Sequence, residues 1–353
     1  MKKILTIIGA RPQFIKAAPM SNAIRKSSVL EEVIVHTGQH FDSNMSSIFF
    51  DQLGLKKPDY MLDINGLTHG AMTGRMMEEI EDIVLKEKPD FILVFGDTNS
   101  TLAGALVAKK LHVKLVHVEA GLRSFNMKMP EEINRIVTDR ISDFLFCPTQ
   151  LAIDNLVDEG FEKFNCIVEK VGDIMYDALR YFEKNASTES PIKEDYVLCT
   201  LHRAENTDFE AKLAGIISSL NEINKTVKVV MPLHPRTKNY IEKYNLILDF
   251  ETIEPVGYLE MISLLKNAKL VLTDSGGLQK ETYFSNKYCI TIREETEWME
   301  LIDNKYNVIV GSNEDKIIKV FNELFYKKFP ENKIELYGDG TCAEKIVKRL
   351  EVG

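Results

Sequence analysis

A strand-to-helix turn in the second half of the chain has the residues of a phosphate-binding site. Residues 269–281 read as a buried strand, a turn of Ser275, Gly276 and Gly277, and a helix that carries Glu281 one turn further on. A helix start offers unpaired backbone N–H groups and the positive end of the helix dipole, and glycines let a ligand approach the bare backbone. The pattern therefore predicts a phosphate cradle. A tight connection capped by Ser275 is the structural alternative.

Three carboxylates in the first half of the chain could carry acid–base chemistry. Asp97 and Glu119 follow short apolar runs, and Glu131 opens a later helical pattern. If the runs are parallel strands, their ends meet at one edge of a sheet, where crowded carboxylates repel and can accept or donate protons near neutral pH. Asp97 could instead cap a turn, and Glu131 could lie in a first helical turn, where the dipole favours it. Glu119 could form a structural ion pair with Arg123.

Residues that can carry positive charge also follow the apolar runs, as the carboxylates do. Arg11 follows the first apolar run, Lys16 lies in the helix after it, and His202 follows the first run of the second half. Arginine and lysine at such turns can contact an anion, and a histidine there could bind a pyrophosphate and protonate it as it departs. The alternatives are solvated surface charge for Arg11 and Lys16, and a structural, hydrogen-bonded imidazole for His202.

The elements that would position these residues alternate along the whole chain. Short β-branched runs are separated by amphipathic helical patterns, an order typical of parallel sheets covered by helices. The runs that we expect to be strands are 4–8, 33–36, 91–95, 115–118, 144–147, 197–200, 227–231, 270–273 and 289–292. The clearest helical patterns are 71–85, 102–111, 209–224 and 317–325. One polar, strand-free stretch, 185–195, separates two α/β halves of similar size.

Composition and cysteine usage exclude several classes of protein. The 353 residues are enough for two ordinary domains, and a formal net charge of −9 argues against nucleic acid or an anionic membrane as the main partner. No apolar run reaches spanning length and the first residues do not form a signal segment, so we expect a cytoplasmic protein. The five cysteines are scattered, and no metal-binding pattern of His, Cys or Asp occurs. We therefore expect no metal site.

Several longer motifs, taken in order, resemble one known family. They are residues 9–16 (GARPQFIK), 37–40 (TGQH), 96–98 (GDT), 117–123 (HVEAGLR), 130–135 (PEEINR), 201–205 (LHRAE), 273–277 (TDSGG) with Gln279 and Glu281, and 337–340 (YGDG). Over essentially the whole chain this set resembles the non-hydrolysing UDP-N-acetylglucosamine 2-epimerases. The resemblance implies an α/β fold of the GT-B type, with two Rossmann-like parallel-sheet domains that face a central cleft.

The resemblance also assigns roles to domains and residues. We expect residues 1–172 to form the sugar-side domain and 173–353 the UDP-binding domain, with the last helix packing back on the first domain. The pyrophosphate of UDP would be held by Arg11, His202, Ser275, Gly276 and Gly277. Glu281 would hold the ribose hydroxyls, and Lys16 would lie near the sugar and phosphates. The residues around the sugar ring would be Asp97, Glu119, Glu131 and Arg135.

The reaction of this family breaks the C1–O bond while the proton at C2 is removed, which gives a 2-acetamidoglucal and UDP. UDP then adds back with a proton on the other face of C2. The catalytic residues would be Asp97, Glu119, Glu131 and His202, and no metal or redox cofactor is implied. We expect a homodimeric epimerase of a UDP-linked 2-acetamido sugar that serves surface polysaccharide synthesis. A UDP-sugar glycosyltransferase of the same fold is the main alternative.

Three departures from the family pattern concern the substrate and its regulation. The family usually has Thr and Glu where this chain has Ala10 and Gln13, and Arg where it has Trp298. These features resemble the branch that converts UDP-2,3-diacetamido-2,3-dideoxy-glucuronate to the mannuronate. Some bacterial members bind a second UDP-N-acetylglucosamine through a Gln-His-x-x-Gln stretch, whereas residues 39–42 read QHFD here. We therefore do not expect that activation.

Overall fold

The computed structural model describes residues 1–39, 54–184 and 192–353. Two predictions fall partly outside these ranges. The polar stretch 185–195 is described only from residue 192 onward, and of the regulatory stretch 39–42 only Gln39 is described.

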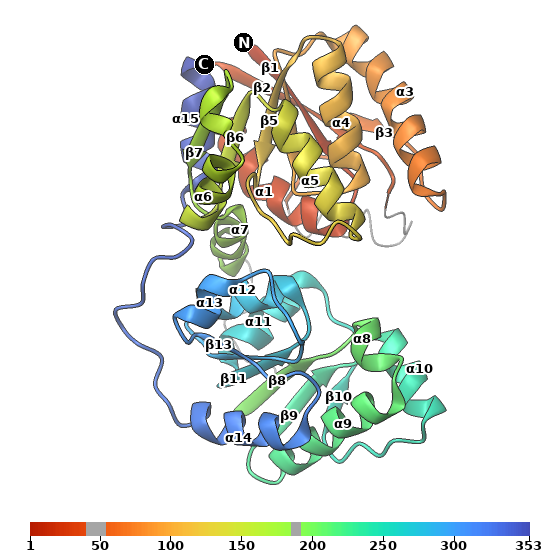
Figure 1. Ribbon diagram of the computed structural model, residues 1–353, viewed down its shortest axis with the longest axis vertical. Coiled ribbons are helices and arrows are strands. Elements are labelled where there is room, and N and C mark those ends of the chain that lie inside the picture. The colour runs from red at the N-terminus through yellow and green to blue at the C-terminus, as the bar shows by residue number, and fades with distance from the viewer. Residues whose placement is uncertain (40–53, 185–191) are drawn as a thin grey trace. The chain divides into compact units, whose positions relative to one another are not determined.

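The described residues form two compact units, one of residues 1–181 with 335–353 and one of residues 182–334 (Figure 1). Each unit is an α/β structure built on its own parallel sheet. The division expected at 172/173 differs from this arrangement. Residues beyond 172 belong to the first unit because they bond to its last segment, as when the Asp173 N–H donates to the Tyr337 carbonyl at 2.9 Å.

The first unit contains a parallel sheet whose described strands follow the order β3-β2-β1-β4-β5-β6-β7. They are β1 (Lys2–Ile8), β2 (Leu30–His36), β3 (Tyr60–Met61), β4 (Phe91–Phe95), β5 (Lys114–Val118), β6 (Phe144–Cys147) and β7 (Ile167–Lys170). Strand β4 is buried at every position, as expected for a strand covered on both faces. Leu93 lies opposite Thr6, and Phe95 lies opposite Val118. The turns after β1, β4 and β5 therefore leave the same edge of the sheet.

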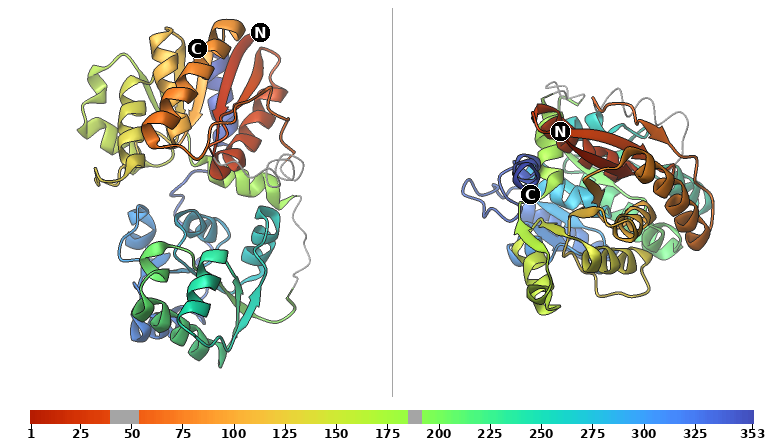
Figure 2. Two further views of the ribbon diagram at one scale, coloured as in Figure 1. Left: turned by 90° about the vertical axis from the view of Figure 1, so that its right-hand side faces the viewer. Right: turned by 90° about the horizontal axis from the view of Figure 1, so that it is seen from above.

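Helices cover both faces of this sheet (Figures 1 and 2). On one face α3 (His69–Glu87), α4 (Asn99–Lys110) and α5 (Pro130–Ile141) pack side by side. On the other, α1 (Arg11–Lys26) packs against α15 (Cys342–Val352). The other described helices that begin in this unit are α6 (Gln150–Asp158), a short 3-10 helix (Phe161–Lys163) and α7 (Ile174–Glu183).

The second unit contains a parallel sheet whose described strands follow the order β10-β9-β8-β11-β12-β13. They are β8 (Tyr196–Thr200), β9 (Lys228–Pro232), β10 (Glu251–Ile253), β11 (Leu270–Thr273), β12 (Cys289–Thr291) and β13 (Asn307–Ile309). Its described helices are α8 (Ala204–Thr207), α9 (Glu210–Asn224), α10 (Pro235–Lys243), α11 (Tyr258–Asn267), α12 (Gly276–Phe284), α13 (Met299–Asp303) and α14 (Glu314–Leu324). Thr200 lies opposite Thr273, so the turns after β8 and β11 meet at one edge.

The start of α15 is held by Asp177 of α7. One oxygen of this carboxylate accepts the Cys342 N–H at 3.0 Å, and the other accepts the Ala343 N–H at 2.8 Å. Because α15 has no side-chain cap of its own, Asp177 satisfies the N–H groups that an N-cap would satisfy. The pKa of Asp177 is raised to about 6, because burial and the nearby Asp173 and Asp339 together outweigh these two hydrogen bonds, which lower it.

The raised pKa of Asp177 predicts a stability that depends on pH. The folded protein binds this proton more tightly than the unfolded chain, so the contribution is full below the ordinary pKa of 3.8 and is lost as pH rises to about 6. Relative to Asp177→Asn, we expect the free energy of unfolding of the wild type to fall by up to about 3 kcal/mol over this interval. Urea unfolding at pH 4 and pH 7 measures the difference. The exposed Asp158→Asn is the control, and a difference that does not change with pH would contradict the assignment.

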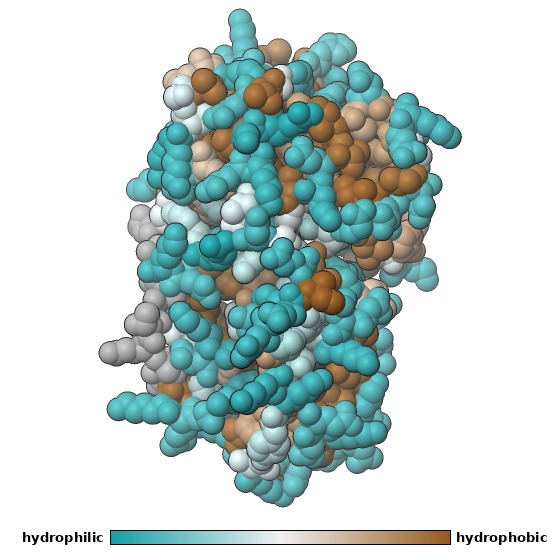
Figure 3. All heavy atoms as spheres, turned by 90° about the vertical axis from the view of Figure 1, so that its left-hand side faces the viewer, coloured by the Kyte–Doolittle hydropathy of each residue, from teal (hydrophilic) through white to brown (hydrophobic). Residues whose placement is uncertain are grey.

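Within the described ranges, no helix combines the length and apolar character needed to cross a bilayer. Hydrophilic side chains cover most of the face shown in Figure 3, with hydrophobic ones in smaller patches. Exposed large side chains such as Phe125, Phe209 and Ile247 belong to different segments. Scattered residues of this kind are ordinary and do not indicate a partner.

Candidate active site

The predicted site residues fall into two groups, each beyond the carboxyl ends of parallel strands. The first, called the carboxylate site, lies in the first unit and contains Arg11, Lys16, Asp97, Glu119, Glu131 and Arg135. The second, called the phosphate site, lies in the second unit and contains His202, Ser275, Gly276, Gly277 and Glu281.

Gln13 fixes the turn between β1 and α1 in the carboxylate site. Its side-chain oxygen accepts the N–H groups of Gly9 at 2.8 Å and Ala10 at 3.1 Å. Its amide nitrogen donates to the Phe95 carbonyl at 2.9 Å and to the Thr98 hydroxyl at 3.0 Å. An ionised glutamate at this position would have no N–H to donate to that carbonyl. Gln13 thus joins the ends of β1 and β4 without charge.

Lys16 and Glu119 form a largely buried ion pair, in which Lys16 Nζ donates to Glu119 Oε2. The backbone of Glu119 has a φ of 70°, a strained conformation that costs about 1–3 kcal/mol and is common at functional sites. A Cβ on Gly96 would lie 3.4 Å from Glu119 Oε2 and 3.6 Å from Lys16 Nζ. The pair therefore packs against the turn that carries Asp97. Arg11, the first residue of α1, is half-buried.

Asp97 is held by two residues of α5. Its carboxylate accepts a hydrogen bond from Arg135, and its backbone carbonyl accepts the Asn134 amide at 2.8 Å. Burial alone would lower the pKa of Arg135, but Asp97 and Glu132 outweigh burial and raise it. The Asp97 side chain is 31% exposed and that of Arg135 is 12% exposed. Arg135 is thus a fixed cation beside a carboxylate that still reaches solvent.

Glu131 and Glu132 are neighbours with opposite environments. Glu131 is exposed on the first turn of α5, and its side chain makes no hydrogen bond or ion pair within the described residues. Glu132 is buried and accepts the N–H groups of Ser124 at 2.9 Å and Phe125 at 2.8 Å. Burial alone would raise the pKa of Glu132, but Ser124, Phe125 and Arg135 lower it. Glu132 is a structural carboxylate that the sequence analysis did not single out.

A buried charge network lies behind the carboxylate site. His117 Nδ1 is 2.7 Å from Asp139 Oδ1, and its Nε2 is 2.8 Å from the Gly96 carbonyl oxygen. The other oxygen of Asp139 accepts the Gly121 N–H at 3.1 Å and the Arg123 guanidinium at 2.6 Å. These bonds connect the turn after β4 to the turn after β5. The network therefore fixes the backbone that carries two of the candidate catalytic carboxylates.

The phosphate site begins at Ser275, the N-cap of α12. Its hydroxyl accepts the Leu278 N–H at 3.5 Å, and its own N–H donates to Thr273 Oγ1 at 2.9 Å. Gly276 and Gly277 form the first turn of the helix. A Cβ on Gly277 would meet nothing within 4 Å, and this glycine does not have a positive φ. The fold therefore does not require glycine at position 277. An anion that approaches the backbone at a helix start would require it, because a side chain would block the approach.

Trp298 supports this turn from inside the unit. Its indole N–H donates to the Gly276 carbonyl at 2.9 Å, and the Lys280 ammonium lies 4.0 Å from its ring centroid. The latter is a cation–π contact. Arg293 forms an ion pair with Glu297 at 2.8 Å. Trp298 is thus a buried anchor of the phosphate turn.

Glu281 lies on the same helix as the turn and is buried. Its Oε1 accepts the hydroxyl of Tyr258 at 2.9 Å. Tyr258 opens α11, so this bond ties the two helices together beside the turn. A buried carboxylate can accept ribose hydroxyls, and that role of Glu281 stays a prediction.

His202 follows β8 and lies beside two residues to which the sequence analysis gave no role. Its Nδ1 is 3.2 Å from Asp274 Oδ1, and its side chain is 40% exposed. The ring of His234, which follows β9, has its centroid 5.6 Å from that of His202. Burial and the nearby His202 lower the pKa of His234. Asp274 precedes Ser275 directly, and this adjacency is the signal that could have identified it.

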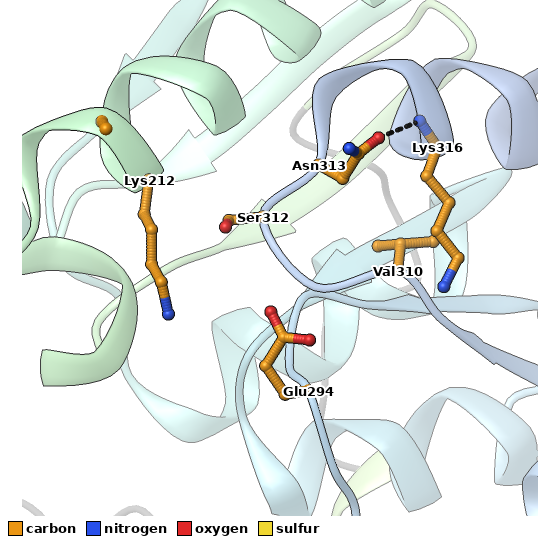
Figure 4. Close-up of a pocket in the computed structure, with 7 residues that line it drawn as sticks. Lys212, Glu294, Val310, Ser312, Asn313 and Lys316 are labelled. Atoms are coloured by element: carbon orange, nitrogen blue, oxygen red, sulfur yellow. Dashed lines mark hydrogen bonds between the residues drawn. The ribbon is translucent and has the colours of Figure 1, made fainter.

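One hollow of about 600 Å³ in the second unit lies apart from the predicted residues. It is lined by Ala211, Lys212, Glu294, Val310, Ser312, Asn313 and Lys316. Figure 4 shows Lys212 on α9 and Glu294 on the loop after β12, and Asn313 accepting the Lys316 N–H at 2.9 Å. Because none of the residues predicted to bind UDP lines this hollow, we assign no role to it.

Comparison with known sequences identifies relatives along the whole chain. Residues 22–351 match the family model described as UDP-N-acetylglucosamine 2-epimerase. The UDP-2,3-diacetamido-2,3-dideoxy-D-glucuronate 2-epimerase of Pseudomonas aeruginosa is 57% identical over 353 residues, which cover 99% of each chain. The UDP-N-acetylglucosamine 2-epimerase of Methanocaldococcus jannaschii is 44% identical over 368 residues, again 99% of each chain.

Comparison with solved structures points to the same family. A crystal structure of Methanocaldococcus jannaschii UDP-GlcNAc 2-epimerase in complex with UDP-GlcNAc and UDP has a TM-score of 0.84 and 42% identity, with full coverage of both chains. The two parallel sheets with their helices are thus of the GT-B type. The chain belongs to the UDP-N-acetylglucosamine 2-epimerase family and is an isomerase of that family.

Proposed function

We propose that this protein inverts C2 of a UDP-linked 2-acetamido sugar by elimination and re-addition of UDP. The observation that carries the proposal is family membership over the whole chain, in a protein that keeps both the phosphate site and the carboxylate site. As the C1–O bond breaks, its electron pair passes to the β-phosphate oxygen and the C2 proton passes to a carboxylate. The resulting glucal has a C1=C2 double bond. Re-addition reverses these steps and delivers the proton to the opposite face of C2.

The departing UDP needs strong stabilisation because a C2 hydrogen is a weak acid. The start of α12 at Gly277 offers N–H groups and the positive end of a helix dipole. We propose that Arg11 and His202 add positive charge next to the pyrophosphate. Such preorganised groups act where negative charge develops in the transition state.

The proton transfers at C2 are assigned to the carboxylate site. We propose Asp97 and Glu131 as the proton carriers, because Asp97 keeps access to solvent and Glu131 is exposed. Glu119 is engaged by Lys16, which favours an orienting role for this carboxylate. Arg135 holds Asp97 in place, and a positioned acid or base of this kind contributes about 10²-fold to 10⁴-fold in rate.

The substrate proposed is UDP-2,3-diacetamido-2,3-dideoxy-glucuronate, with UDP-N-acetylglucosamine as the competing one. Support comes from the Pseudomonas aeruginosa relative at 57% identity and from the departures at Ala10, Gln13 and Trp298. In a side-by-side assay we expect kcat/KM to be at least about 10-fold higher for the diacetamido-glucuronate nucleotide, which is about 1.4 kcal/mol of discrimination. A higher kcat/KM for UDP-N-acetylglucosamine would change the proposed substrate but not the proposed reaction.

Turnover in D2O tests the reaction type. We expect deuterium at C2 of the product and traces of glucal and UDP, measured by NMR and mass spectrometry. Product without deuterium at C2 would contradict the mechanism. UDP formation that depends strictly on an added acceptor would instead indicate a glycosyltransferase, and free sugar in amounts equal to UDP would indicate a hydrolysing epimerase.

The proposal extends to assembly and location. We propose a cytoplasmic homodimer that supplies surface polysaccharide synthesis. The five cysteines are free, which suits a reducing compartment. Light scattering after size exclusion should give twice the chain mass of 40.3 kDa. A single-chain mass would exclude the dimer.

A further inference from the structure

Asp274 joins the two polar turns of the phosphate site. It follows β11, precedes Ser275 and is fully buried, with an exposed fraction of 0%. Its Oδ2 accepts the backbone N–H groups of His202 at 3.0 Å and Arg203 at 2.8 Å, and the side-chain amide of Asn206 at 3.2 Å. These bonds fix the turn after β8 relative to the phosphate turn.

The other oxygen of Asp274 faces the ring of His202. Oδ1 lies 3.2 Å from His202 Nδ1 and 3.2 Å from its backbone nitrogen. Burial alone would raise the pKa of Asp274, but His202 and the backbone N–H groups lower it. An ionised carboxylate only accepts hydrogen bonds. The ring therefore presents Nδ1 to Asp274 as an N–H.

The proton on Nδ1 determines which hydrogen bonds the ring of His202 can form with an anion. A neutral ring with its proton on Nδ1 has a lone pair on Nε2, which repels a phosphate oxygen. The imidazolium has an N–H on both nitrogens, so it can bond to Asp274 and to an anion together.

We propose that Asp274 is a positioning residue that holds His202 as an imidazolium with its Nε2–H directed at the departing pyrophosphate of UDP. The inference rests on the proposed function, because that function makes UDP a leaving group. The negative charge on UDP grows as the C1–O bond breaks. A fixed cation therefore stabilises the transition state more than the bound substrate.

The ring of His234 has different hydrogen-bond partners from that of His202. Its Nδ1 accepts the backbone N–H of Arg236 at 3.2 Å, so the proton of its neutral ring lies on Nε2. Burial comes first among the causes that lower the pKa of His234, and His202 and Arg236 add to it, while Asp274 opposes them. The two rings lie 5.6 Å apart, and it is Nδ1 of His202 that lies beside the Asp274 carboxylate.

The substitution Asp274→Asn tests the proposal. Asparagine keeps an oxygen for the backbone N–H groups but has no charge. We expect kcat to fall by about 10²-fold to 10³-fold, with a much smaller change in KM. Ring ¹⁵N NMR at pH 7 with saturating UDP should show both His202 nitrogens protonated in the wild type and only one in the variant. Asp208→Asn is the matched control, since Asp208 bonds to Arg236 at 2.6 Å and not to this ring. The control should leave the His202 signals and kcat unchanged.

The experiment separates this inference from the proposed function. A neutral His202 ring in the UDP-bound wild type overturns the proposal, even if Asp274→Asn fails to fold. In a His202→Gln background, Asp274→Asn should cost far less in kcat, and a fully additive loss also overturns it. A doubly protonated ring in a wild type that epimerises none of the UDP-sugars tested would support the role of Asp274 and contradict the proposed function.

Discussion

Replacing Asp97 by asparagine is expected to lower kcat for epimerisation by about 10²-fold to 10⁴-fold. Asparagine cannot exchange a proton with C2, but its amide oxygen can still accept a hydrogen bond from Arg135. Because Arg135 also keeps its bond to Glu132, the variant leaves no unpaired buried cation. The loss should therefore appear in the chemical step, and the free energy of unfolding should change by less than about 1 kcal/mol.

The measurement separates chemistry from binding. Trp298 is the single tryptophan and contacts the phosphate turn, so its fluorescence can report UDP binding. The Kd for UDP should be nearly unchanged in Asp97→Asn, while deuterium incorporation at C2 in D2O should fall together with kcat. Asp82→Asn, on an exposed part of α3, is the matched control and should match the wild type. Full activity of Asp97→Asn would exclude Asp97 as an acid or base and leave Glu131 as the candidate.

The strands that the sequence predicted correctly are interior ones. β4, β6 and β11 have the bounds expected from their apolar runs. The described strands that were not expected, β3, β7, β10 and β13, all lie at sheet edges. β10 (Glu251–Ile253), for example, is exposed at its first two positions. An edge strand has one neighbour and less cover, so it needs no continuous apolar run and leaves no clear pattern.

In the carboxylate site, the sequence predicted where the charged residues lie better than it predicted which residues they pair with. Strand ends place Glu119 at the sheet edge, but its partner Lys16 is 103 positions away. The nearby Arg123, considered as a partner for Glu119, instead forms ion pairs with the buried Asp139 and with Glu159. Such pairs depend on how distant segments cross, which spacing within one segment does not reveal.

Glu131 and Glu132 show that sequence position alone does not distinguish an exposed side chain from a buried one. Both are glutamates in the first turn of α5, and the helix turns by about 100° from one to the next. That rotation exposes Glu131 and buries Glu132 against the loop at Ser124. Only the orientation of the helix on its sheet distinguishes a candidate catalytic acid from a structural one.

Replacing Gly277 by alanine is expected to leave the fold intact and weaken UDP binding. Gly277 has helical backbone angles on α12, and a Cβ there would meet no protein atom within 4 Å. Alanine is favoured over glycine in a helix, so the free energy of unfolding should stay the same or rise by up to about 1 kcal/mol. If a phosphate approaches this backbone, the added methyl group occupies its place. We expect the Kd for UDP to rise by at least about 10-fold, which is about 1.4 kcal/mol.

The matched control is Gly74→Ala on α3, since Gly74 is also helical and a Cβ there also meets nothing within 4 Å. Neither variant should lose stability in urea unfolding, but only Gly277→Ala should lose UDP affinity in a titration followed by Trp298 fluorescence. Lost affinity with unchanged or increased stability in one variant indicates a glycine kept for a ligand. An unchanged Kd in a folded Gly277→Ala protein would show that the phosphates do not approach this turn, and α12 would then be an ordinary strand-to-helix connection capped by Ser275.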